Sequence, residues 1–438
     1  MRLAQLYQRP WLWVYLPLAL LATAAIGLLW AWVFPIPSQH LRISTGAPEG
    51  IYFANAQLYA QKFAEHGITL QVLPSAGSVE NMARISDLAS GVDLALVQGG
   101  FGSLTSSPIG SSSAVQTLAN IDIEPVWIFT RMQELDSLSQ LQGLRVSIGP
   151  VGSGSRKVAL KLLESANLGE KDLQLVDTFG MGAVRALVDN KLDVAMFVSA
   201  PGAPAVNAML ATPGIGLVHL RHAAALTERI PYLESRMLAQ GMLDPNGKFP
   251  RQDIGMLVTT ASLVARESLS PALKRLATQV ATEVHQRGGA FYKAGDFPNL
   301  GQADFPVAPE ARQTLLHGLP WLEQRLGFWS VQALWRVLLL VLPIVLLGIA
   351  LARLLPAYAS WLMESRVNRW YGELKYIEHD LAQESPSGLD LSKYHSRLKT
   401  MEFDVHSFPT PPELMQRLYI LQQHIEFVRL KVLRMRGR

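Results

Sequence analysis

The sequence predicts an α/β domain of two lobes, set between two transmembrane helices and followed by an α-helical tail. Three observations lead to this fold class. Two long apolar runs flank residues 38–330. Within that middle region, short runs rich in β-branched residues alternate with helical patterns. Beyond the second apolar run, apolar residues recur at spacings of three and four.

The composition supports this reading and excludes other classes of protein. The chain has 438 residues, of which 49% are apolar and 17% charged, and it contains no cysteine. Such a chain is neither disordered nor collagen-like, and it favours membrane segments. Without cysteine, Cys-ligated zinc, iron–sulfur clusters and thiol nucleophiles are excluded. A formal charge of +4 is too small to indicate a nucleic-acid partner.

The first apolar run covers residues 11–34 without a charge, which is long enough to cross a bilayer core of roughly 30 Å. Tryptophans lie near both of its ends, where amphipathic rings favour the membrane interface. A cleaved signal peptide is the alternative, because Ala22, Ala24 and Ala25 could form a processing site. The run continues past them to Phe34, so we expect it to be retained as an anchor.

The second apolar run predicts a transmembrane helix at residues 335–355, in which Pro343 is tolerated. The alternative is a buried core helix. Basic residues lie before the first run and after the second, which predicts that residues 1–10 and 356–438 are both cytoplasmic. The chain would then contact the lipid bilayer through two spans and expose residues 38–330 on the other side.

The alternation in the middle region is typical of βαβ units and parallel sheets. We expect strands at residues 41–45, 69–74, 92–98, 125–130, 144–150, 192–198 and 255–260. We expect helices at residues 52–66, 79–90, 156–167 and 183–190. The length favours two lobes, placed at residues 38–125 with 250–330 and at residues 126–249. A segment around Pro201, Gly202 and Pro204 is expected to form one edge of the cleft.

Polar and glycine-rich loops follow the predicted strands, where open α/β sheets bind ligands. The candidate binding residues in these loops are Thr45, Gly46, Gly50, Tyr52, Gly77, Ser78, Asn81, Gln98, Ser153, Gly154, Ser155 and Arg156. Each loop taken alone also fits an ordinary turn or serine N-cap. Because all of them follow strands, we expect them to hold a small anionic or zwitterionic solute through helix N-termini, hydroxyls, an amide and one guanidinium.

These segments resemble the TAXI class of TRAP-transporter solute-binding proteins. The likeness runs in order over most of residues 41–260, through STGAPEGIYF, PSAGSVENMARISDLASGVDLALVQ, LQGLRVSIGPVGSGS, and LDVAMFV with APGAP. It implies a two-lobed periplasmic-binding-protein fold of type II that closes on a small organic acid or amino acid. It also implies delivery to a TRAP membrane permease subunit, with the main domain periplasmic at the inner membrane of a bacterium.

The sequence also departs from the family at several positions. Ala47, Pro48 and Glu49 stand where the family usually has glycines, Val158 replaces a frequent asparagine, and Arg156 adds a cation. The identity of the solute and the coupling ion are therefore left open. Members of the family usually lack a second span and a tail.

The tail, residues 356–438, is expected to form two amphipathic helices with a break at residues 385–388. The apolar positions are Val367, Trp370, Leu374, Ile377 and Leu381, then Leu414, Leu418, Leu421, Ile425, Val428 and Val432. Either the hairpin packs on itself, or it docks with a helical partner or self-associates. Its basic end could contact anionic lipid.

No catalytic constellation is present in the sequence. Gly149 and Gly154 have the spacing of a phosphate-binding loop, but Ser155 follows where that loop has a lysine. His219 and His222 lack a third ligand for a metal. We therefore expect no enzyme, no cofactor and no metal site. The leading hypothesis is a membrane-anchored solute-binding subunit, and the alternative is a transmembrane sensory receptor that signals through its tail.

Overall fold

The computed structural model describes residues 21–30, 36–102, 115–132, 135–244, 246, 249–383, 390–408 and 414–436. The chain divides into two compact units, Ala31–Leu334 and Met1–Trp30 with Trp335–Arg438. The predicted N-terminal segment 1–10, most of the predicted transmembrane helix 11–34 and the predicted break at 385–388 lie outside the described residues.

The larger unit is built on a mixed sheet that has ten strands within the described residues. The strands are β1 His40–Ser44, β2 Thr69–Leu73, β3 Leu94–Gln98, β4 Val115–Thr130, β5 Arg145–Ser147, β6 Gln174–Leu175, β7 Val194–Val198, β8 Gly216–Leu217, β9 Glu234–Leu238 and β10 Ile254–Arg266. Their order is β2-β1-β3-β10-β4-β7-β5-β6, with β8 on β4 and β9 on β10.

The sheet is mixed where the sequence predicted parallel pairing. β1 is parallel to β2 and β3, and β5 is parallel to β6 and β7. β10, however, is antiparallel to β3, β4 and β9, and β4 is antiparallel to β7 and β8. The two long strands β4 and β10 run antiparallel to their neighbours. Simple βαβ repetition would have made all of these strands parallel.

The strands β4 and β10 connect two halves of the sheet. β4 pairs with β10 from Val115 to Pro125, and from Val126 to Thr130 it pairs with β7. We call the part with β1, β2 and β3 the first half, and the part with β5, β6 and β7 the second half. The sequence predicted only residues 125–130 and 255–260 of these strands.

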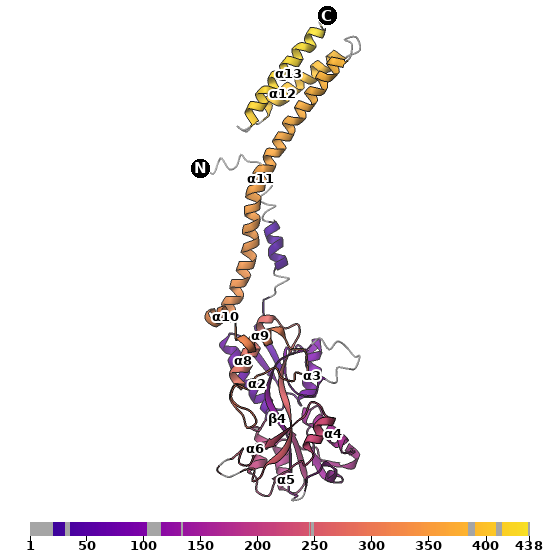
Figure 1. Ribbon diagram of the computed structural model, residues 1–438, viewed down its shortest axis with the longest axis vertical. Coiled ribbons are helices and arrows are strands. Elements are labelled where there is room, and N and C mark those ends of the chain that lie inside the picture. The colour runs from indigo at the N-terminus through magenta and orange to yellow at the C-terminus, as the bar shows by residue number, and fades with distance from the viewer. Residues whose placement is uncertain are drawn as a thin grey trace. The chain divides into compact units, whose positions relative to one another are not determined.

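The described residues of this unit also form nine α-helices before the start of α11 at Phe328. They are α2 Ile51–Glu65, α3 Ser78–Ser86, α4 Gly154–Ser165, α5 Met181–Val188, α6 Pro204–Ala211, α7 Ala223–Arg229, α8 Pro271–His285, α9 Pro309–His317 and α10 Trp321–Leu326. Figure 1 shows α2, α3, α8 and α9 around one end of β4, and α4, α5 and α6 around the other. Helices therefore surround both halves of the sheet.

The cores follow from residue patterns on these elements. In the first half, Tyr59 and Phe63 of α2 pack with Ile43 of β1 in one buried cluster. In the second half, Ile128 and Trp127 belong to different clusters. Successive side chains of a strand point to opposite faces, so this alternation means that β4 is buried on both faces there.

Two aspartates hold neighbouring strands together. Asp93, just before β3, accepts a hydrogen bond from the amide of Arg42 in β1 at 2.9 Å. Asp193, just before β7, accepts one from the amide of Arg145 in β5 at 2.9 Å. The guanidinium of Arg145 also pairs with Asp193 at 2.6 Å and lowers the pKa of that carboxyl. The same device therefore fixes one strand pair in each half.

The smaller unit contains α12 Leu391–Ser407 and α13 Met415–Arg436, and α11 Phe328–Gln383 extends into it. Within the described part of the chain, one helical stretch, Phe328–Leu351, is long and apolar enough to cross a membrane, with a mean hydropathy of 2.6. The described residues also include a shorter apolar helical stretch, Leu21–Trp30. A pair of spans flanking the main domain therefore stays a prediction.

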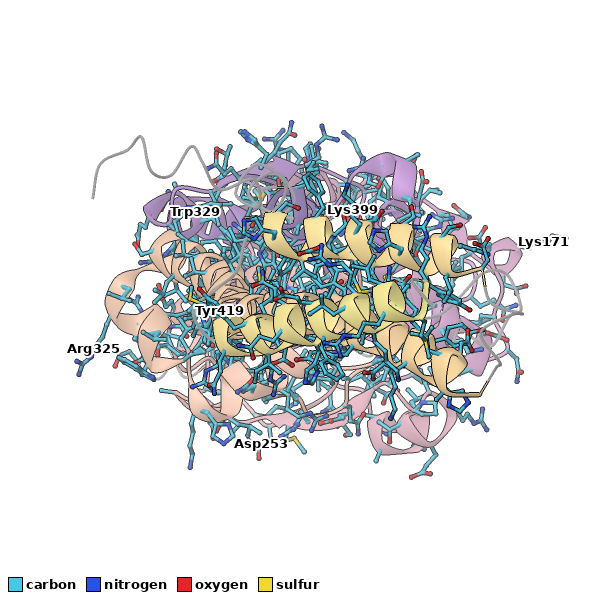
Figure 2. The ribbon with its side chains drawn as sticks, turned by 90° about the horizontal axis from the view of Figure 1, so that it is seen from above. Lys171, Asp253, Arg325, Trp329, Lys399 and Tyr419 are labelled. Atoms are coloured by element: carbon cyan, nitrogen blue, oxygen red, sulfur yellow. The ribbon has the colours of Figure 1, made fainter. Side chains whose placement is uncertain are left out.

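The tail packs on itself. Residues of three helices share one buried cluster, which includes Leu374 of α11, Leu398 of α12 and Leu421 of α13. Figure 2 shows α12 and α13 side by side, with Lys399 and Tyr419 labelled on them. The predicted apolar positions from Val367 to Val432 are buried here except Trp370, which is partly buried. The helix α12 was not predicted.

Candidate functional site

A cleft of about 440 Å³ lies between the two halves of the sheet. The first half contributes residues 46–52, 76–78, 98 and 124 to its lining. The second half contributes residues 149, 150, 153–155, 179–181, 196–199 and 203–206. Segments far apart in the sequence therefore meet around one space, as expected for loops that follow strands.

The cleft gathers most of the predicted binding residues. Those in its lining are Gly46, Gly50, Tyr52, Gly77, Ser78, Gln98, Ser153, Gly154 and Ser155. Thr45, Asn81 and Arg156 are not among the residues that line it. Of the predicted cleft edge, Pro204 lines the cleft, while Pro201 and Gly202 do not.

Thr45 and Asn81 are buried and hold the loops of the first half in place. The hydroxyl of Thr45 donates to the carbonyl oxygen of Leu73 at 2.9 Å. Asn81 Oδ1 accepts from the hydroxyls of Ser44 and Ser75 at 2.6 and 2.7 Å, and its Nδ2 donates to Leu96 at 2.7 Å. Asn81 thus ties together the ends of β1, β2 and β3, and its polar atoms are used within the protein.

Arg156 was expected to supply a guanidinium to the ligand, but the structure directs it elsewhere. Its Nη2 pairs with Glu170 Oε1 at 2.8 Å. Glu170 lies beyond the C-terminal end of α4, so the pair joins two segments of the second half. The contact that Arg156 makes is therefore an ion pair within the second half, away from the cleft lining.

The N-terminus of α3 was expected to face the ligand with Ser78 as its cap. Instead Gly77 is the N-cap and Ser78 is the first helical residue. The Ser78 hydroxyl accepts the amide of Gln98 at 2.9 Å. The amides of Val79 and Glu80 donate to the carbonyl oxygen of Gly152 at 3.2 and 3.3 Å. A carbonyl of the second half therefore satisfies two donors at the start of a first-half helix.

Glycine is required where the halves touch. A Cβ on Gly154 would lie 2.3 Å from Gln98 Oε1 and 3.1 Å from the Ser78 hydroxyl oxygen. Gly77 has φ of 132°, a backbone conformation that favours glycine, and its Cβ position lies 3.1 Å from the Cα of Ser153. A side chain at position 77 would meet Ser153, and one at position 154 would meet Gln98. Either would force the two halves apart or displace that neighbour.

The start of α4 presents its first amides to the cleft. Ser153 caps this helix, because its hydroxyl oxygen accepts the amide of Arg156 at 3.1 Å. Gly154 and Ser155 occupy the first turn, whose amides have no partner inside a helix, and both residues line the cleft. The Ser155 hydroxyl is engaged with the backbone of Val198. This helix end can therefore offer backbone donors to an anionic group of a solute.

The floor of the cleft holds a carboxyl that the sequence analysis missed. Glu124 is 2% exposed, and its Oε2 accepts hydrogen bonds from the hydroxyl of Tyr52 at 3.0 Å and from Nε2 of Gln98 at 3.1 Å. Burial raises its pKa to about 8. The sequence signal for it was the presence of three polar residues, Asn120, Asp122 and Glu124, at alternate positions just before the predicted strand 125–130.

The acidic side chains in the cleft lining are not balanced by basic ones. Glu49 and Glu124 line it, and the described lining contains no lysine, arginine or histidine. The remaining walls are largely apolar, with Phe179, Phe197 and Met196 among them. The cleft therefore differs from the cationic pocket that the sequence analysis expected.

Lys157 makes a second contact between the halves, outside the cleft lining. Its Nζ donates to the carbonyl oxygen of Gly100 at 2.6 Å and lies 3.5 Å from the centre of the Phe101 ring. Burial lowers the pKa of Lys157 to about 8. This lysine belongs to α4, whereas Gly100 and Phe101 follow β3, so it links the second half to the first.

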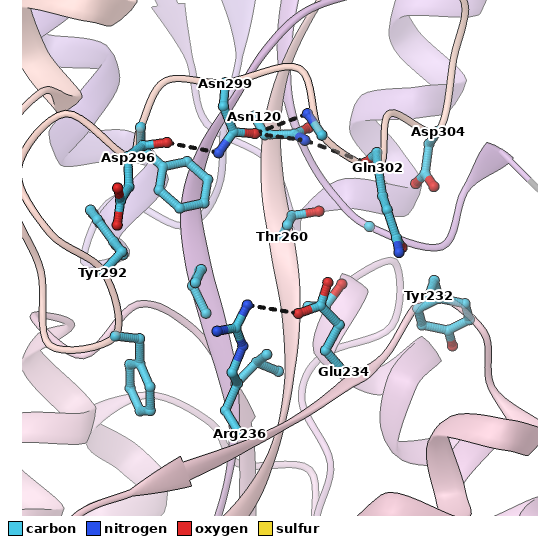
Figure 3. A pocket seen from close by; sticks show the side chains of 17 residues that line it. Asn120, Tyr232, Glu234, Arg236, Thr260, Tyr292, Asp296, Asn299, Gln302 and Asp304 are labelled. Carbon is cyan, nitrogen blue, oxygen red and sulfur yellow. Dashed lines mark hydrogen bonds and ion pairs between the residues drawn. The ribbon is translucent and has the colours of Figure 1, made fainter.

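A smaller cavity of about 260 Å³ adjoins β9, β10 and residues 291–304. Figure 3 shows Glu234 and Arg236, both of β9, as an ion pair on one side of it, and Asn120 beside Asn299. It contains none of the predicted binding residues. Among the described residues, no group of three or more His, Cys, Asp or Glu could hold a metal ion.

Comparisons with known proteins identify a family. A model described as the NMT1-like family matches residues 43–287, which is more than half of the chain. No curated protein matches the sequence. The match does not distinguish the TAXI class, which stays a prediction.

Several solved structures are similar to this chain. A Bordetella bronchiseptica RB50 protein has 16% identity and a TM-score of 0.40, over 57% of this chain and 71% of its own. The periplasmic aliphatic sulphonate binding protein SsuA from Escherichia coli has 12% identity and a TM-score of 0.36, over 57% and 69%. The effector binding domain of a BenM variant has 11% identity and a TM-score of 0.35, over 56% and 94%.

Proposed function

The chain belongs to the NMT1-like family, which has a periplasmic-binding-protein fold, and we propose that it captures a small organic acid or amino acid outside the cytoplasm. The observation that carries this proposal is the cleft of about 440 Å³, lined by loops from both halves of the sheet. A solute in this space would touch both halves at once.

The mechanism is closure of the two halves around the solute. β4 and β10 run through both halves and form the connection about which they move. A solute that contacts the first half at Gln98 and Glu124 and the second half at Gly154 and Ser155 binds the closed arrangement better than the open one. It therefore shifts the population toward closure by its differential affinity.

We further propose that the chain is the membrane-anchored solute-binding subunit of a TAXI-type TRAP transporter. Its type II lobes would be residues 38–125 with 250–330 and residues 126–249, held outside the inner membrane by two spans with both termini cytoplasmic. The order of the TAXI-like segments and the apolar stretch Phe328–Leu351 support this. The closed form would deliver its solute to a membrane permease subunit.

A sensory receptor is the second candidate function. α11 runs without interruption from Phe328 to Gln383 and contains both the candidate span and the first helix of the tail cluster. A solute-driven movement at the start of this helix would have a direct covalent route to the tail. In this case the tail, rather than a permease, would receive the signal.

The capture function is tested with the full-length protein in detergent, in a thermal-shift screen against organic acids and amino acids. A solute that binds the native state raises the melting temperature by mass action, by an amount that grows with its concentration. If no organic acid or amino acid raises it at millimolar concentration, the proposal is wrong.

Removal of residues 384–438 separates transport from sensing. If the chain serves transport, cells with the truncated protein take up the solute at nearly the normal rate, and a gene for a carrier with many spans adjoins this one. If it senses, truncation abolishes the cellular response while the purified protein keeps its solute affinity.

A further inference from the structure

Two oxygen atoms at the floor of the cleft are left for a donor that the protein does not supply. Gln98 is 3% exposed, and among the described residues its Oε1 has no hydrogen-bond partner. Both donors to Glu124, the Tyr52 hydroxyl and Gln98 Nε2, bind Oε2, so Oε1 of Glu124 is left for a further donor. Gln98 and Glu124 both line the cleft.

The orientation of Gln98 is fixed by its neighbours. Its backbone amide donates to Ser78, and its side-chain Nε2 donates to Glu124, which directs the amide oxygen away from that carboxyl. The oxygen lies against Gly154, at the start of α4 in the second half. A buried acceptor without a donor costs free energy, which a ligand that brings an N–H group would recover.

The side chains around these oxygens favour a cationic donor. Glu49 and Glu124 are acidic, the described lining holds no basic side chain, and Arg156 is paired with Glu170. An ammonium group carries three N–H donors and a positive charge, so it can bond to an amide oxygen and a carboxylate oxygen together.

We propose that Glu124 and Gln98 hold the protonated amine of the solute, so that the ligand is an amino acid or another primary amine rather than a simple organic acid. This rests on the proposed capture function and narrows its substrate class. For an amino acid, the carboxylate would meet the amides of Gly154 and Ser155 at the start of α4. The ligand would then bridge the two halves with its two charged ends.

The protonation of Glu124 gives the proposal a distinctive signature. The titratable groups near Glu124 are Tyr52 from α2, Asp122 on its own strand, and Glu49 in the cleft lining. Burial is the main cause that raises the pKa of Glu124 to about 8, so the carboxyl is mostly protonated at pH 7. An ammonium beside it lowers that pKa, and binding expels the proton. An oxo acid would place a second carboxylate nearby and favour retention of the proton.

The test uses full-length protein and isothermal titration calorimetry in two buffers of different ionisation enthalpy. The probes are matched pairs: L-glutamate with 2-oxoglutarate, L-leucine with 4-methyl-2-oxopentanoate, and putrescine with 1,4-butanediol. We expect one amine to bind at least about tenfold more tightly than its partner and to release close to one proton at pH 7. Its affinity should rise with pH up to about 8, by up to about tenfold per pH unit.

The variant Glu124→Gln should weaken the amine by about 10- to 100-fold, while Glu170→Gln, outside the cleft lining, leaves it unchanged. The proton release is measured on the unmodified chain, so it decides the matter even if Glu124→Gln does not fold. Tighter binding of the oxo acid, or of the diol, would overturn the amine assignment and leave capture standing. Failure of all six probes to bind would overturn both.

Discussion

The backbone amide of Val79 donates a hydrogen bond to the carbonyl oxygen of Gly152 at 3.2 Å, which joins the first half of the sheet to the second. Glu80 makes the same contact at 3.3 Å, and Gly154 lies against Gln98 beside it. The loops before α3 and α4 therefore meet at one mouth of the cleft. How closely they approach depends on glycine at the points of contact.

The variant Gly154→Ala should hold the two halves apart. The added Cβ would lie 2.3 Å from Gln98 Oε1, so the halves must separate or the glutamine must move. We expect solute binding to weaken by about 1 to 3 kcal/mol, the usual cost of overpacking. The measurement is titration calorimetry with the best solute from the thermal-shift screen.

Gly202→Ala is the matched control, because a Cβ at that position has no neighbour within 4 Å. It should bind the solute as the unmodified protein does. Equal affinities for the two variants would show that the contact at Gly154 is not needed for binding.

The stability of the protein should depend on pH through Glu124. Its pKa is raised from 4.5 to about 8 in the native state, so the native state keeps a proton that the unfolded chain has lost between these values. The resulting stabilisation is complete below pH 4.5 and is lost as the pH rises through about 8. Glu124→Gln should therefore gain stability relative to the unmodified chain by about 2 to 4 kcal/mol between pH 5 and 8, as measured by chemical unfolding.

Asp122→Asn provides a comparison with a different pH window. Burial raises the pKa of Asp122 from 3.8 to about 6. The difference in unfolding free energy between Asp122→Asn and the unmodified chain should therefore reach its full size near pH 6 to 7. An unfolding free energy whose pH dependence is the same with and without Glu124 would contradict the proposed burial of a neutral carboxyl.

Arg156→Ala should leave solute affinity unchanged. A hydrogen bond from this guanidinium to a ligand carboxylate, as the sequence suggested, would have made the loss about 1.5 to 3 kcal/mol. Since the guanidinium pairs with Glu170 at 2.8 Å, and Glu170 is 49% exposed, its removal should cost about 0 to 1 kcal/mol of stability only. Weaker binding in calorimetry, with normal unfolding, would show that the arginine reaches the solute.

Lys157→Met should speed solute release. The lysine joins the halves through Gly100 and Phe101, and we expect the closed form to lose about 1 to 2 kcal/mol without it. The dissociation rate, measured by stopped-flow displacement, should rise while the association rate changes little.

The control for this change is Lys161→Met on the same helix, because Lys161 pairs only with Glu164 one turn away among the described residues. The solute should dissociate from this variant at the normal rate. If both variants release the solute equally fast, the link between Lys157 and the first half has no role in retention.

Much of the strand and loop framework was predictable from the sequence. β-branched runs marked β1, β2, β3, β5 and β7, because buried strands need such residues on a continuous apolar surface. The loops after them carried the glycines and hydroxyls that now line the cleft. These features are local, so short sequence windows contain their signal.

Other parts of the site depend on contacts between distant residues. The sequence indicated Arg156 as a ligand-binding residue because its partner, Glu170, comes close to it only in the folded chain. Glu124 was missed because polar residues interrupt the apolar pattern of its strand, which was not recognised before Pro125. The contact of Val79 with Gly152 involves only backbone atoms, which every residue has, so no pattern of residue types predicts it.

That backbone contact also separates two tasks that evolution can adjust independently. The contact between Val79 and Gly152 needs no particular side chain beyond the glycines that allow it. The proposed selection of the solute depends instead on Gln98 and Glu124 at the floor of the cleft. Substitutions at the floor of the cleft could therefore change which solute is bound, while the closure of the two halves is retained.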